Sequence, residues 1–254
     1  MNRALEKLIH TTRLISKHVL GLLLPQKCLK CGAPGKAFCS DCQRASYKAG
    51  GQCLICGFRN GTGGFCPPCR KSSSASLEKV LWAGRYDGAL KGAVWELKYK
   101  NRKTLAEPLA RMLFQKFSEI FPDFKNGEFL AIPIPLHKSK LRQRGFNQAG
   151  LLAKEFSRLS NIRLLTNSLL KIKETPAQVE AKNKEERIKN LEGAFVVNLP
   201  LHNPLLIKEG EMGVTTIILI DDIATTGATL IHAANALKLA GAQKIIGLVV
   251  AHGG

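Results

Sequence analysis

The sequence predicts an α/β protein in which a parallel sheet flanked by helices follows a small cysteine-rich module. Two observations predict the sheet: the runs 217–220 and 245–251 are short, apolar and rich in β-branched residues, and a helical pattern at 226–239 separates them. Such runs are typical of strands buried on both faces of a parallel sheet. A third observation predicts the module, because all eight cysteines lie between positions 28 and 69.

Length and composition are those of a folded protein with an unusual charge. The 254 residues suffice for one full-sized α/β domain and a small module, and 45% hydrophobic residues argue against wholesale disorder. A net charge of +19 predicts attraction to phosphate-rich ligands, anionic polymers or anionic lipid surfaces. Charge alone gives no specificity, and a solubilising lysine-rich surface is the alternative. No segment approaches the ~20 apolar residues of a membrane span.

Residues 1–24 predict a basic amphipathic helix, because their apolar residues recur near helical spacing. The apolar run 19–24 is shorter than the roughly 7–15 residues of a signal-peptide core, and no small-residue cleavage site follows it. We therefore expect a cytoplasmic protein. Packing onto the rest of the chain is the expected role of this helix, and lying on a membrane surface is the alternative.

The cysteines form four C-x-x-C pairs, a spacing that predicts two zinc sites with four thiolates each. The predicted ligands are Cys28, Cys31, Cys39, Cys42, Cys53, Cys56, Cys66 and Cys69. Disulfides fit poorly in a chain without an export signal, and a redox pair would be expected near a βαβ pattern. With no open coordination position, both zinc ions would be structural, and folding of this segment should depend on them.

The order of the pairs leaves two arrangements open. A sequential double zinc ribbon, which we favour, joins the first pair to the second and the third to the fourth. A cross-braced arrangement would join the first to the third and the second to the fourth. The ribbons are expected over 25–72, and the polar run 71–76 is expected to link them to a larger domain at 77–254.

The first half of the larger domain predicts a strand, two helices and a second strand. A short extended piece and a helix are expected within 77–100, a helix over about 104–120, and a strand at 129–133. The segment 135–149 then carries cations and no acid, and leads to a helix capped by Asn147. Arg144 suits a pyrophosphate, because a cation at a strand's carboxyl end can pair with its charge. Gly145 lets the backbone approach such a ligand closely. A solvated basic loop is the alternative.

The segment 216–230 carries the clearest chemistry. A buried strand leads to Asp221 and Asp222, and a small, hydroxyl-rich turn follows at 224–229 before a helix begins. Backbone N–H groups at a helix N-terminus favour a phosphate, whereas two carboxylates suit the vicinal hydroxyls of a polyol. Together they predict a site for a ribose 5-phosphate. An ordinary strand-turn-helix with Thr226 as N-cap is the alternative, but capping does not explain the carboxylate pair.

Residues 219–229 resemble the ribose-phosphate signature of type I phosphoribosyltransferases. The resemblance implies that family's fold, with phosphoribosyl pyrophosphate and magnesium as ligands, and ribose hydroxyls held by Asp221 and Asp222. The residues it assigns to the 5-phosphate are Ala224, Thr225, Thr226, Gly227, Ala228 and Thr229. The polar stretch 170–192 corresponds to that family's flexible lid, with Lys171, Gln178 and Arg187 as contacts. A solvated hairpin or helix face is the alternative for this stretch.

Further motifs resemble the ComF family of competence proteins. These are Pro133 with Arg144-Gly-Phe-Asn-Gln-Ala149, Leu97-Lys-Tyr99, Thr175-Pro-Ala-Gln178, and Arg187 with Asn190 and Gly193-Ala-Phe195. ComF proteins join an N-terminal zinc module to a phosphoribosyltransferase-like domain, and this resemblance implies a role in DNA uptake or DNA use.

Three functions remain open at this level. We favour a protein that binds phosphoribosyl pyrophosphate and magnesium and acts in DNA uptake, with DNA-uptake proteins as partners. The alternatives are an active transferase of nucleotide metabolism and a single-stranded DNA-binding module with a regulatory ligand site. That module would use the zinc ribbons and Tyr99 or Phe146 for stacking. The sequence shows no acid/base dyad, so we assign no catalytic residue, and the acceptor of a transferase is not identified.

Overall fold

The computed structural model describes residues 26–48, 53, 56, 58, 65–72, 76–125, 128–174, 191–198 and 216–253. Its centre is a five-stranded sheet in the order β1-β7-β6-β2-β3, and every neighbouring pair of strands is parallel. The strands are β1 (Lys79–Arg85), β2 (Phe129–Pro133), β3 (Arg163–Leu164), β6 (Thr216–Ala224) and β7 (Lys244–His252). The predicted parallel sheet flanked by helices is confirmed.

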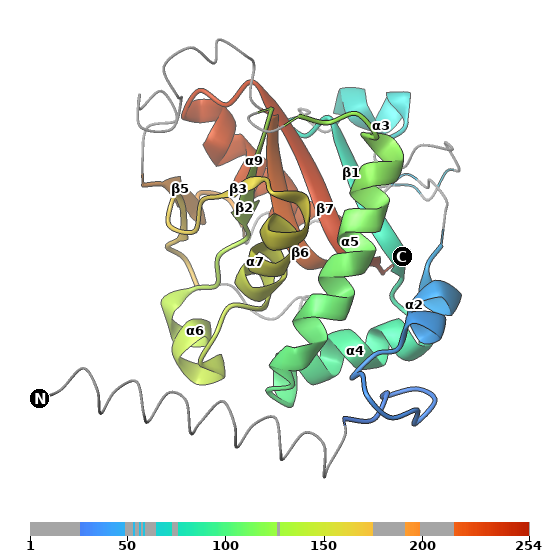
Figure 1. Ribbon diagram of the computed structural model, residues 1–254. Coiled ribbons are helices and arrows are strands. Elements are labelled where there is room, and N and C mark those ends of the chain that lie inside the picture. Colours follow the sequence, from blue (N-terminus) through green and yellow to red (C-terminus); the bar gives the residue numbers. More distant parts are fainter. Residues whose placement is uncertain are drawn as a thin grey trace, which may run out of the picture.

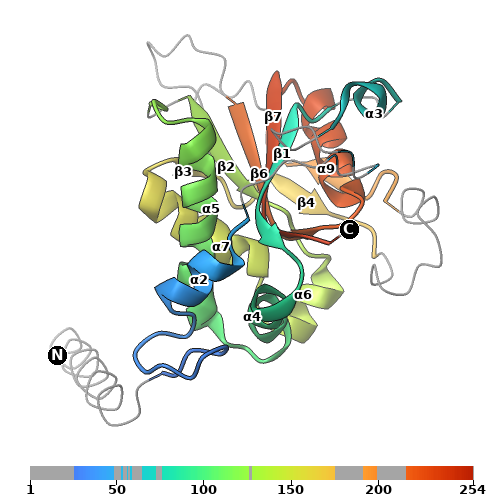
Figure 2. The same ribbon diagram turned by 90° about the vertical axis from the view of Figure 1, so that its right-hand side faces the viewer.

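Helices cover both faces of the sheet (Figures 1 and 2). One face packs against α4 (Gly88–Tyr99), α5 (Ala106–Ile120) and α7 (Gln148–Ser160), and α5 follows a single 3-10 turn at Lys103–Leu105. The other face packs against α9 (Ala228–Leu239) and a two-stranded antiparallel sheet of β4 (Leu169–Lys171) and β5 (Phe195–Val197). Two apolar clusters, one on each face, therefore sandwich the central strands.

The central strand β6 is longer than its apolar run. Residues Ile217 to Ile220 are at most 3% exposed, as expected for a strand between β7 and β2. The strand continues to Ala224, so Asp221 and Asp222 lie within it and not in the turn behind it. Successive side chains of a strand point to opposite faces of a sheet. The two carboxylates consequently leave β6 on opposite sides.

The segment between β2 and α7 contains a helix that the sequence pattern did not predict. Residues Lys138–Arg144 form α6, which is capped by His137 at its start and by Gly145, whose φ of 77° is left-handed, at its end. Asn147 caps α7 as predicted, since its side chain accepts a hydrogen bond from the backbone N–H of Ala149 at 3.1 Å. The basic segment is thus largely helical.

The cysteine-rich region contributes two short helices, α2 (Ser40–Ser46) and α3 (Pro67–Ser72). Lys71 and Ser72, expected in a linker, complete α3. The first part of the region shares an apolar cluster with α4 and α5 through the fully buried Phe38, and Phe65 belongs to the cluster on the opposite face of the sheet. Residues 1–24, Thr175 to Gln178 and Arg187 lie outside the described residues. Among the residues the structure describes, no helix is both long and apolar enough to cross a membrane.

Candidate functional site

The candidate site lies where the parallel strands end. β1, β7, β6 and β2 all run toward the end of the molecule that carries α4 and α6, which is the lower end in Figure 1. Ligands of open parallel sheets bind outside this edge. The predicted residues from β6, from the turn behind it and from α6 therefore belong to one end of the fold.

Asp222 points toward α4 and forms a buried ion pair there. Its Oδ1 lies 2.9 Å from the Lys98 Nζ, and the two side chains are 3% and 17% exposed. Its other oxygen, Oδ2, is buried and has no hydrogen-bond partner among the described residues. A buried carboxylate oxygen without a hydrogen-bond donor costs free energy. The Oδ2 atom of Asp222 is therefore suited to accept a hydrogen bond from a ligand.

Asp221 points to the other face and has different electrostatics. Its Oδ1 accepts a hydrogen bond from the backbone N–H of Asp222 at 2.8 Å. Burial, and then the charge of Asp222, raise the pKa of Asp221 to about 7, although Lys98 and Lys171 oppose the shift. The two neighbouring carboxyls therefore differ: Asp222 is paired with Lys98, and the pKa of Asp221 lies near neutral pH.

Lys98 is a site residue that sequence reasoning did not assign. Burial lowers the pKa of its ammonium, but the charge of Asp222 and its hydrogen bond outweigh burial and raise it. A cation in a helix rich in lysine carries no signal that it faces a strand carboxylate. Only the Leu97-Lys-Tyr99 motif, noted for its resemblance, pointed to this position.

The turn after β6 combines a left-handed glycine with a helix start. Gly227 has a φ of 74°, and α9 begins at Ala228 and not at Thr226, because only the residues after Gly227 have helical geometry. The Thr226 hydroxyl accepts from the backbone N–H of Ala228 at 3.4 Å. The carbonyl of Ala224 accepts from Gly253 at 2.9 Å, which ties the turn to the end of β7. The other two hydroxyl residues predicted for the phosphate are Thr225, which lies in this turn, and Thr229, which lies in the first turn of α9.

Arg144 and Lys171 bring positive charge to the same edge from two sides. The Arg144 guanidinium donates to the Gln148 side chain and lies 5.4 Å from the centroid of the Tyr99 ring, next to Lys98 in sequence. Lys171 lies on the side of Asp221. Burial, and then repulsion by Lys140, lower the pKa of Lys171 to about 8, whereas the Asp221 charge raises it.

His252, at the end of β7, is a second residue that the sequence did not single out. It pairs in register with Ala224, beside the turn, and its ring stacks on Trp82 with centroids 5.0 Å apart. Its Nε2 is buried without a hydrogen-bond partner among the described residues. Burial, and then the nearby Arg85, lower the pKa of His252, so its imidazole is neutral at physiological pH.

The cysteines gather in two groups of four in the sequential arrangement. Cys28, Cys31, Cys39 and Cys42 form one group, and Cys53, Cys56, Cys66 and Cys69 form the other. Within each group the Sγ atoms lie within 4.8 Å of one another, and one pair in each lies 3.6 Å apart. Thiolates on a tetrahedral zinc ion are separated by ~3.8 Å, given a Zn–S bond of about 2.3 Å. None of the eight forms a disulfide. Both groups fit zinc, and the cross-braced pairing is wrong.

The backbone around the first group favours a thiolate. Burial raises the pKa of Cys28, but N–H groups of Cys31, Cys39 and Lys30 outweigh it and lower the pKa to about 6. The Cys39 amide lies 3.5 Å from the Cys28 Sγ. Amides directed at sulfur are a feature of metal-binding turns, because they stabilise its negative charge.

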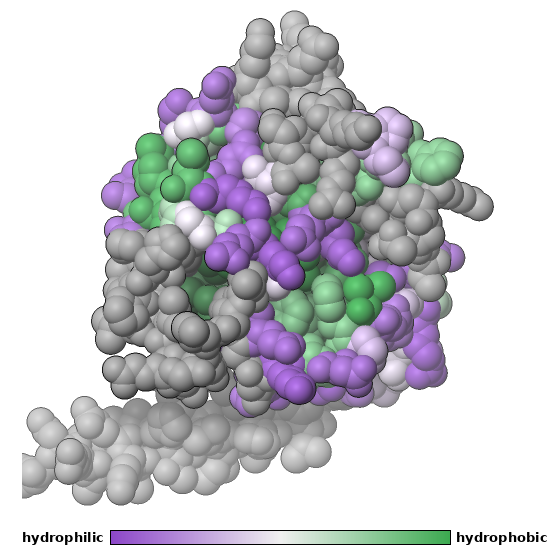
Figure 3. Space-filling model, turned by 90° about the horizontal axis from the view of Figure 1, so that it is seen from above, coloured by the Kyte–Doolittle hydropathy of each residue, from purple (hydrophilic) through white to green (hydrophobic). Residues whose placement is uncertain are grey.

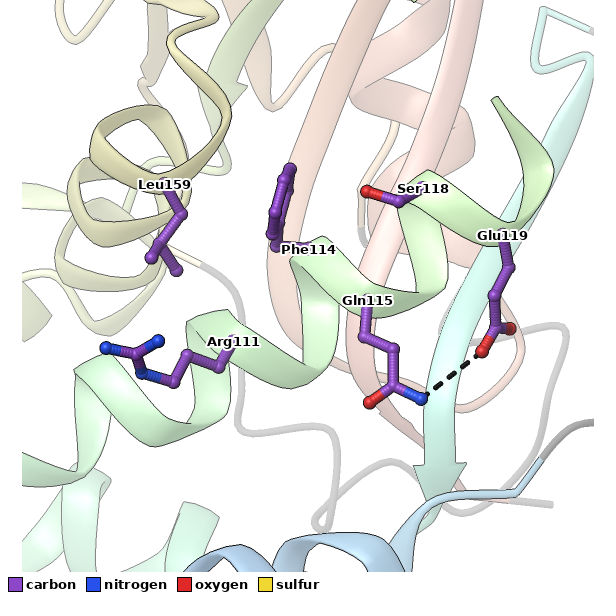
Figure 4. Close-up of a pocket in the computed structure, with 6 residues that line it drawn as sticks. All are labelled: Arg111, Phe114, Gln115, Ser118, Glu119 and Leu159. Carbon is purple, nitrogen blue, oxygen red and sulfur yellow. Dashed lines mark hydrogen bonds between the residues drawn. The ribbon is translucent and has the colours of Figure 1, made fainter. Parts of the chain in front are cut away.

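A cavity of about 530 Å³ lies elsewhere, between α5 and α7 (Figure 4). Arg111, Phe114 and Leu159 contribute to its lining, and the Gln115 side chain donates to Glu119 at its rim. It contains neither of the β6 carboxylates nor the turn. This cavity is therefore separate from the candidate site.

No family model matches the chain. Competence protein F of Haemophilus influenzae is 30% identical to it over 210 residues, which cover 82% of this chain and 86% of that protein. The chain belongs to the competence protein F family. Competence protein ComFC of Bacillus subtilis is 27% identical to this chain, over 80% of this chain and 79% of its own length. DNA utilization protein YhgH of Salmonella typhi is 25% identical over 88% of this chain and 96% of its own.

Proposed function

We propose that this member of the competence protein F family acts in DNA uptake or DNA utilisation and binds phosphoribosyl pyrophosphate with magnesium at the end of β6. The names of its relatives support the first part. One observation carries the second part: the buried Oδ2 of Asp222 has no hydrogen-bond donor among the described residues. A ribose hydroxyl supplies the missing donor.

In this proposal, different residues bind different parts of the phosphorylated sugar. Asp222 accepts a hydrogen bond from one ribose hydroxyl, and Asp221, which leaves β6 on the other face, is proposed as a second acceptor from the sequence resemblance alone. The turn at 224–229 binds the 5-phosphate through its backbone N–H groups, assisted by the hydroxyls of Thr225, Thr226 and Thr229. Arg144 and Gly145 on one side and Lys171 on the other receive the pyrophosphate. Arg187 is proposed for the same role from the sequence resemblance alone.

The donor set also fits magnesium, which takes hard oxygen ligands. Asp222 is the residue that would hold it, together with oxygens of the ligand and waters, and the ion would neutralise the pyrophosphate charge. Lys98 pairs with Asp222 at 2.9 Å, and a hydrogen bond donated by a ribose hydroxyl would favour the ionised form of Asp221.

Calorimetry with phosphoribosyl pyrophosphate and magnesium tests the site. We expect binding to the wild-type chain and a loss of at least tenfold in affinity on Asp222→Asn, because the amide replaces a charged acceptor. Lys244→Ala is the matched control, since Lys244 is exposed at the opposite end of the sheet. Equal binding by wild type and Asp222→Asn would overturn the assignment of the carboxylate pair.

Transfer of the phosphoribosyl group to a base is the second candidate function, because the same arrangement of carboxylates, phosphate turn and cations suits either role. Catalysis would rest on positioning and charge neutralisation, not on an acid/base pair. Pyrophosphate release measured with a panel of nucleobases separates the two. Release with one of them indicates a transferase, and binding without release indicates a ligand-binding protein.

A further inference from the structure

The end of the molecule that carries the candidate site also exposes two aromatic side chains. Trp95 and Tyr99 are 45% and 62% exposed, although large aromatic residues usually bury most of their surface. They are four residues apart on α4, so they share one face of the helix, and their ring centroids lie 5.9 Å apart. The other apolar residues of α4, Leu90, Ala93, Val94 and Leu97, are buried in the core. The two rings are therefore an isolated aromatic pair on a helix that is otherwise anchored.

Cations surround this aromatic pair. Lys100 lies 5.3 Å from the centroid of Trp95, and Arg144 lies 5.4 Å from that of Tyr99. Nearby, Lys103 covers the largely buried Phe146 at 4.9 Å. We call the surface formed by Trp95, Tyr99, Lys100, Lys103 and Arg144 the α4–α6 surface.

Among the described residues, the acidic groups nearest the α4–α6 surface have hydrogen-bond or ion-pair partners. Glu96 on α4 pairs with Arg102 at 2.7 Å. At the far end of α6, Glu174 accepts from Ser139 and lies 3.9 Å from the His137 ring. Helix α6 itself carries Lys138, Lys140, Arg142 and Arg144 and no acid. Figure 3 shows the opposite end of the molecule, where hydrophilic and hydrophobic residues are interspersed over the described surface.

We propose that the α4–α6 surface binds single-stranded DNA, with bases stacked on Trp95 and Tyr99 and phosphates on Lys100, Lys103 and the cations of α6. Single-strand sites combine stacking aromatics with a positively charged track. This inference rests on the DNA role in the proposed function and names the surface that performs it. Since Lys98 contacts Asp222 and Tyr99 follows Lys98, the strand would pass beside the phosphoribosyl pyrophosphate site.

A membrane surface fits the α4–α6 surface less well. An interfacial helix needs a broad apolar face that enters the headgroup region. Here the remaining apolar residues of α4 face the core, and the two exposed rings have cations directly over them. That arrangement favours flat ligands with phosphates over acyl chains.

Fluorescence anisotropy of a labelled dT oligonucleotide with the zinc-loaded full-length chain tests the proposal. We expect Trp95→Ala and Tyr99→Ala each to weaken binding by roughly tenfold, the scale of lost stacking on one ring. Trp95→Phe should bind nearly as well as wild type, because it keeps a ring. Leu239→Ala is the matched control, since Leu239 is 92% exposed at the end of α9 and outside the α4–α6 surface.

Intrinsic fluorescence gives an independent reading. The chain has two tryptophans, and Trp82 is 4% exposed, so quenching by an oligonucleotide should come from Trp95 and vanish in Trp95→Phe. Lys100→Ala should lower the slope of log affinity against log salt by about 0.7, and Lys244→Ala should not change it.

The outcomes separate this proposal from the function on which it rests. If wild type binds no oligonucleotide, both the α4–α6 proposal and direct DNA binding as part of the proposed function are wrong. If wild type binds and both alanine variants bind equally well, only the α4–α6 surface is wrong. Loss of binding to phosphatidylglycerol vesicles in the alanine variants, with oligonucleotide binding intact, would assign the surface to a membrane and overturn the proposal. Retained calorimetric binding of phosphoribosyl pyrophosphate by both variants shows that the ligand site is intact.

Discussion

The cysteine groups and the carboxylate pair are both clusters of anionic ligand atoms held by the backbone, but only the cysteine groups are closed. Each group of four sulfurs surrounds one point and needs a single ion to satisfy all of its members. At the end of β6, Asp222 keeps one buried oxygen without a donor even though Lys98 pairs with the other. A cluster whose ligand atoms are all satisfied by one ion stabilises the fold, whereas a cluster with an unpartnered oxygen can still bind a ligand.

Removing zinc should have the largest effect, because structural zinc contributes on the order of 10 kcal/mol to the folding of such sites. We expect a strong chelator to abolish the cooperative unfolding transition of the cysteine-rich region. Since Phe38 lies in the cluster shared with α4 and α5, the melting temperature of the sheet should fall as well. Differential scanning calorimetry with and without chelator, followed by added zinc, measures both. An unchanged thermogram would contradict a structural role for the metal.

Asp222→Asn should be the most destabilising change at the open site. It leaves the Lys98 ammonium buried without its counter-ion, a loss of about 3–5 kcal/mol for a buried pair. Urea denaturation at pH 7 measures the loss. In the double variant Lys98→Met/Asp222→Asn most of that stability should return, because the uncompensated charge is gone. A double variant as unstable as Asp222→Asn would show that the pair is not the cause.

Asp221→Asn should act in the opposite direction, although the two residues are neighbours. Folding raises the pKa of Asp221 to about 7, whereas an unfolded aspartate titrates near ~4. The folded chain therefore holds an extra proton between these values and loses stability as the pH rises from about 4 to 7. The amide removes this penalty. Thermal melts should show a higher melting temperature than wild type at pH 8, about half of that difference in stability at pH 5.5 and little difference near pH 4, and equal melts at pH 8 would contradict the shift.

Thr226→Ala should have the smallest effect on stability. The hydroxyl accepts one long hydrogen bond, 3.4 Å from the Ala228 amide, and Gly227 already ends the preceding turn. We expect a loss of about 0.5 kcal/mol by urea denaturation, at the low end for a capping residue. Affinity for ribose 5-phosphate should fall more than stability does. A large loss of stability would show that the Thr226 hydroxyl stabilises the fold and is not mainly a ligand contact.

The sequence predicted the two kinds of cluster unequally well, for physical reasons. Each C-x-x-C turn specifies two ligands of one metal, so the eight zinc ligands were predictable residue by residue, whereas the grouping of the four turns into two sites required the structure. The parallel sheet followed from apolar runs such as 217–220. The partner of Asp222 was not predictable, because Lys98 reaches it from a helix 124 positions earlier in the chain, a separation that no local pattern records.

Two features of the site also depended on tertiary structure. The helix α6 was missed because its residues, Lys138–Arg144, lack an apolar face, and none of them is buried. His252 was missed because its position beside the turn depends on the register of β7 with β6. The two carboxylates point in opposite directions because β6 extends to Ala224. The sequence did not predict this extension, because the two residues that follow Ile220 are polar.

The unpaired oxygen of Asp222 is proposed to receive a ribose hydroxyl. Calorimetry of wild type and Asp222→Asn with ribose 5-phosphate and its 2-deoxy and 3-deoxy analogues tests this, because each analogue lacks one of the two neighbouring hydroxyls. We predict that wild type binds ribose 5-phosphate at least tenfold more tightly than one of the analogues, since a hydrogen bond to a charged group is worth about 1.5–3 kcal/mol, and that Asp222→Asn abolishes most of that preference. Equal affinity of wild type for all three sugars would show that Asp222 receives no ribose hydroxyl.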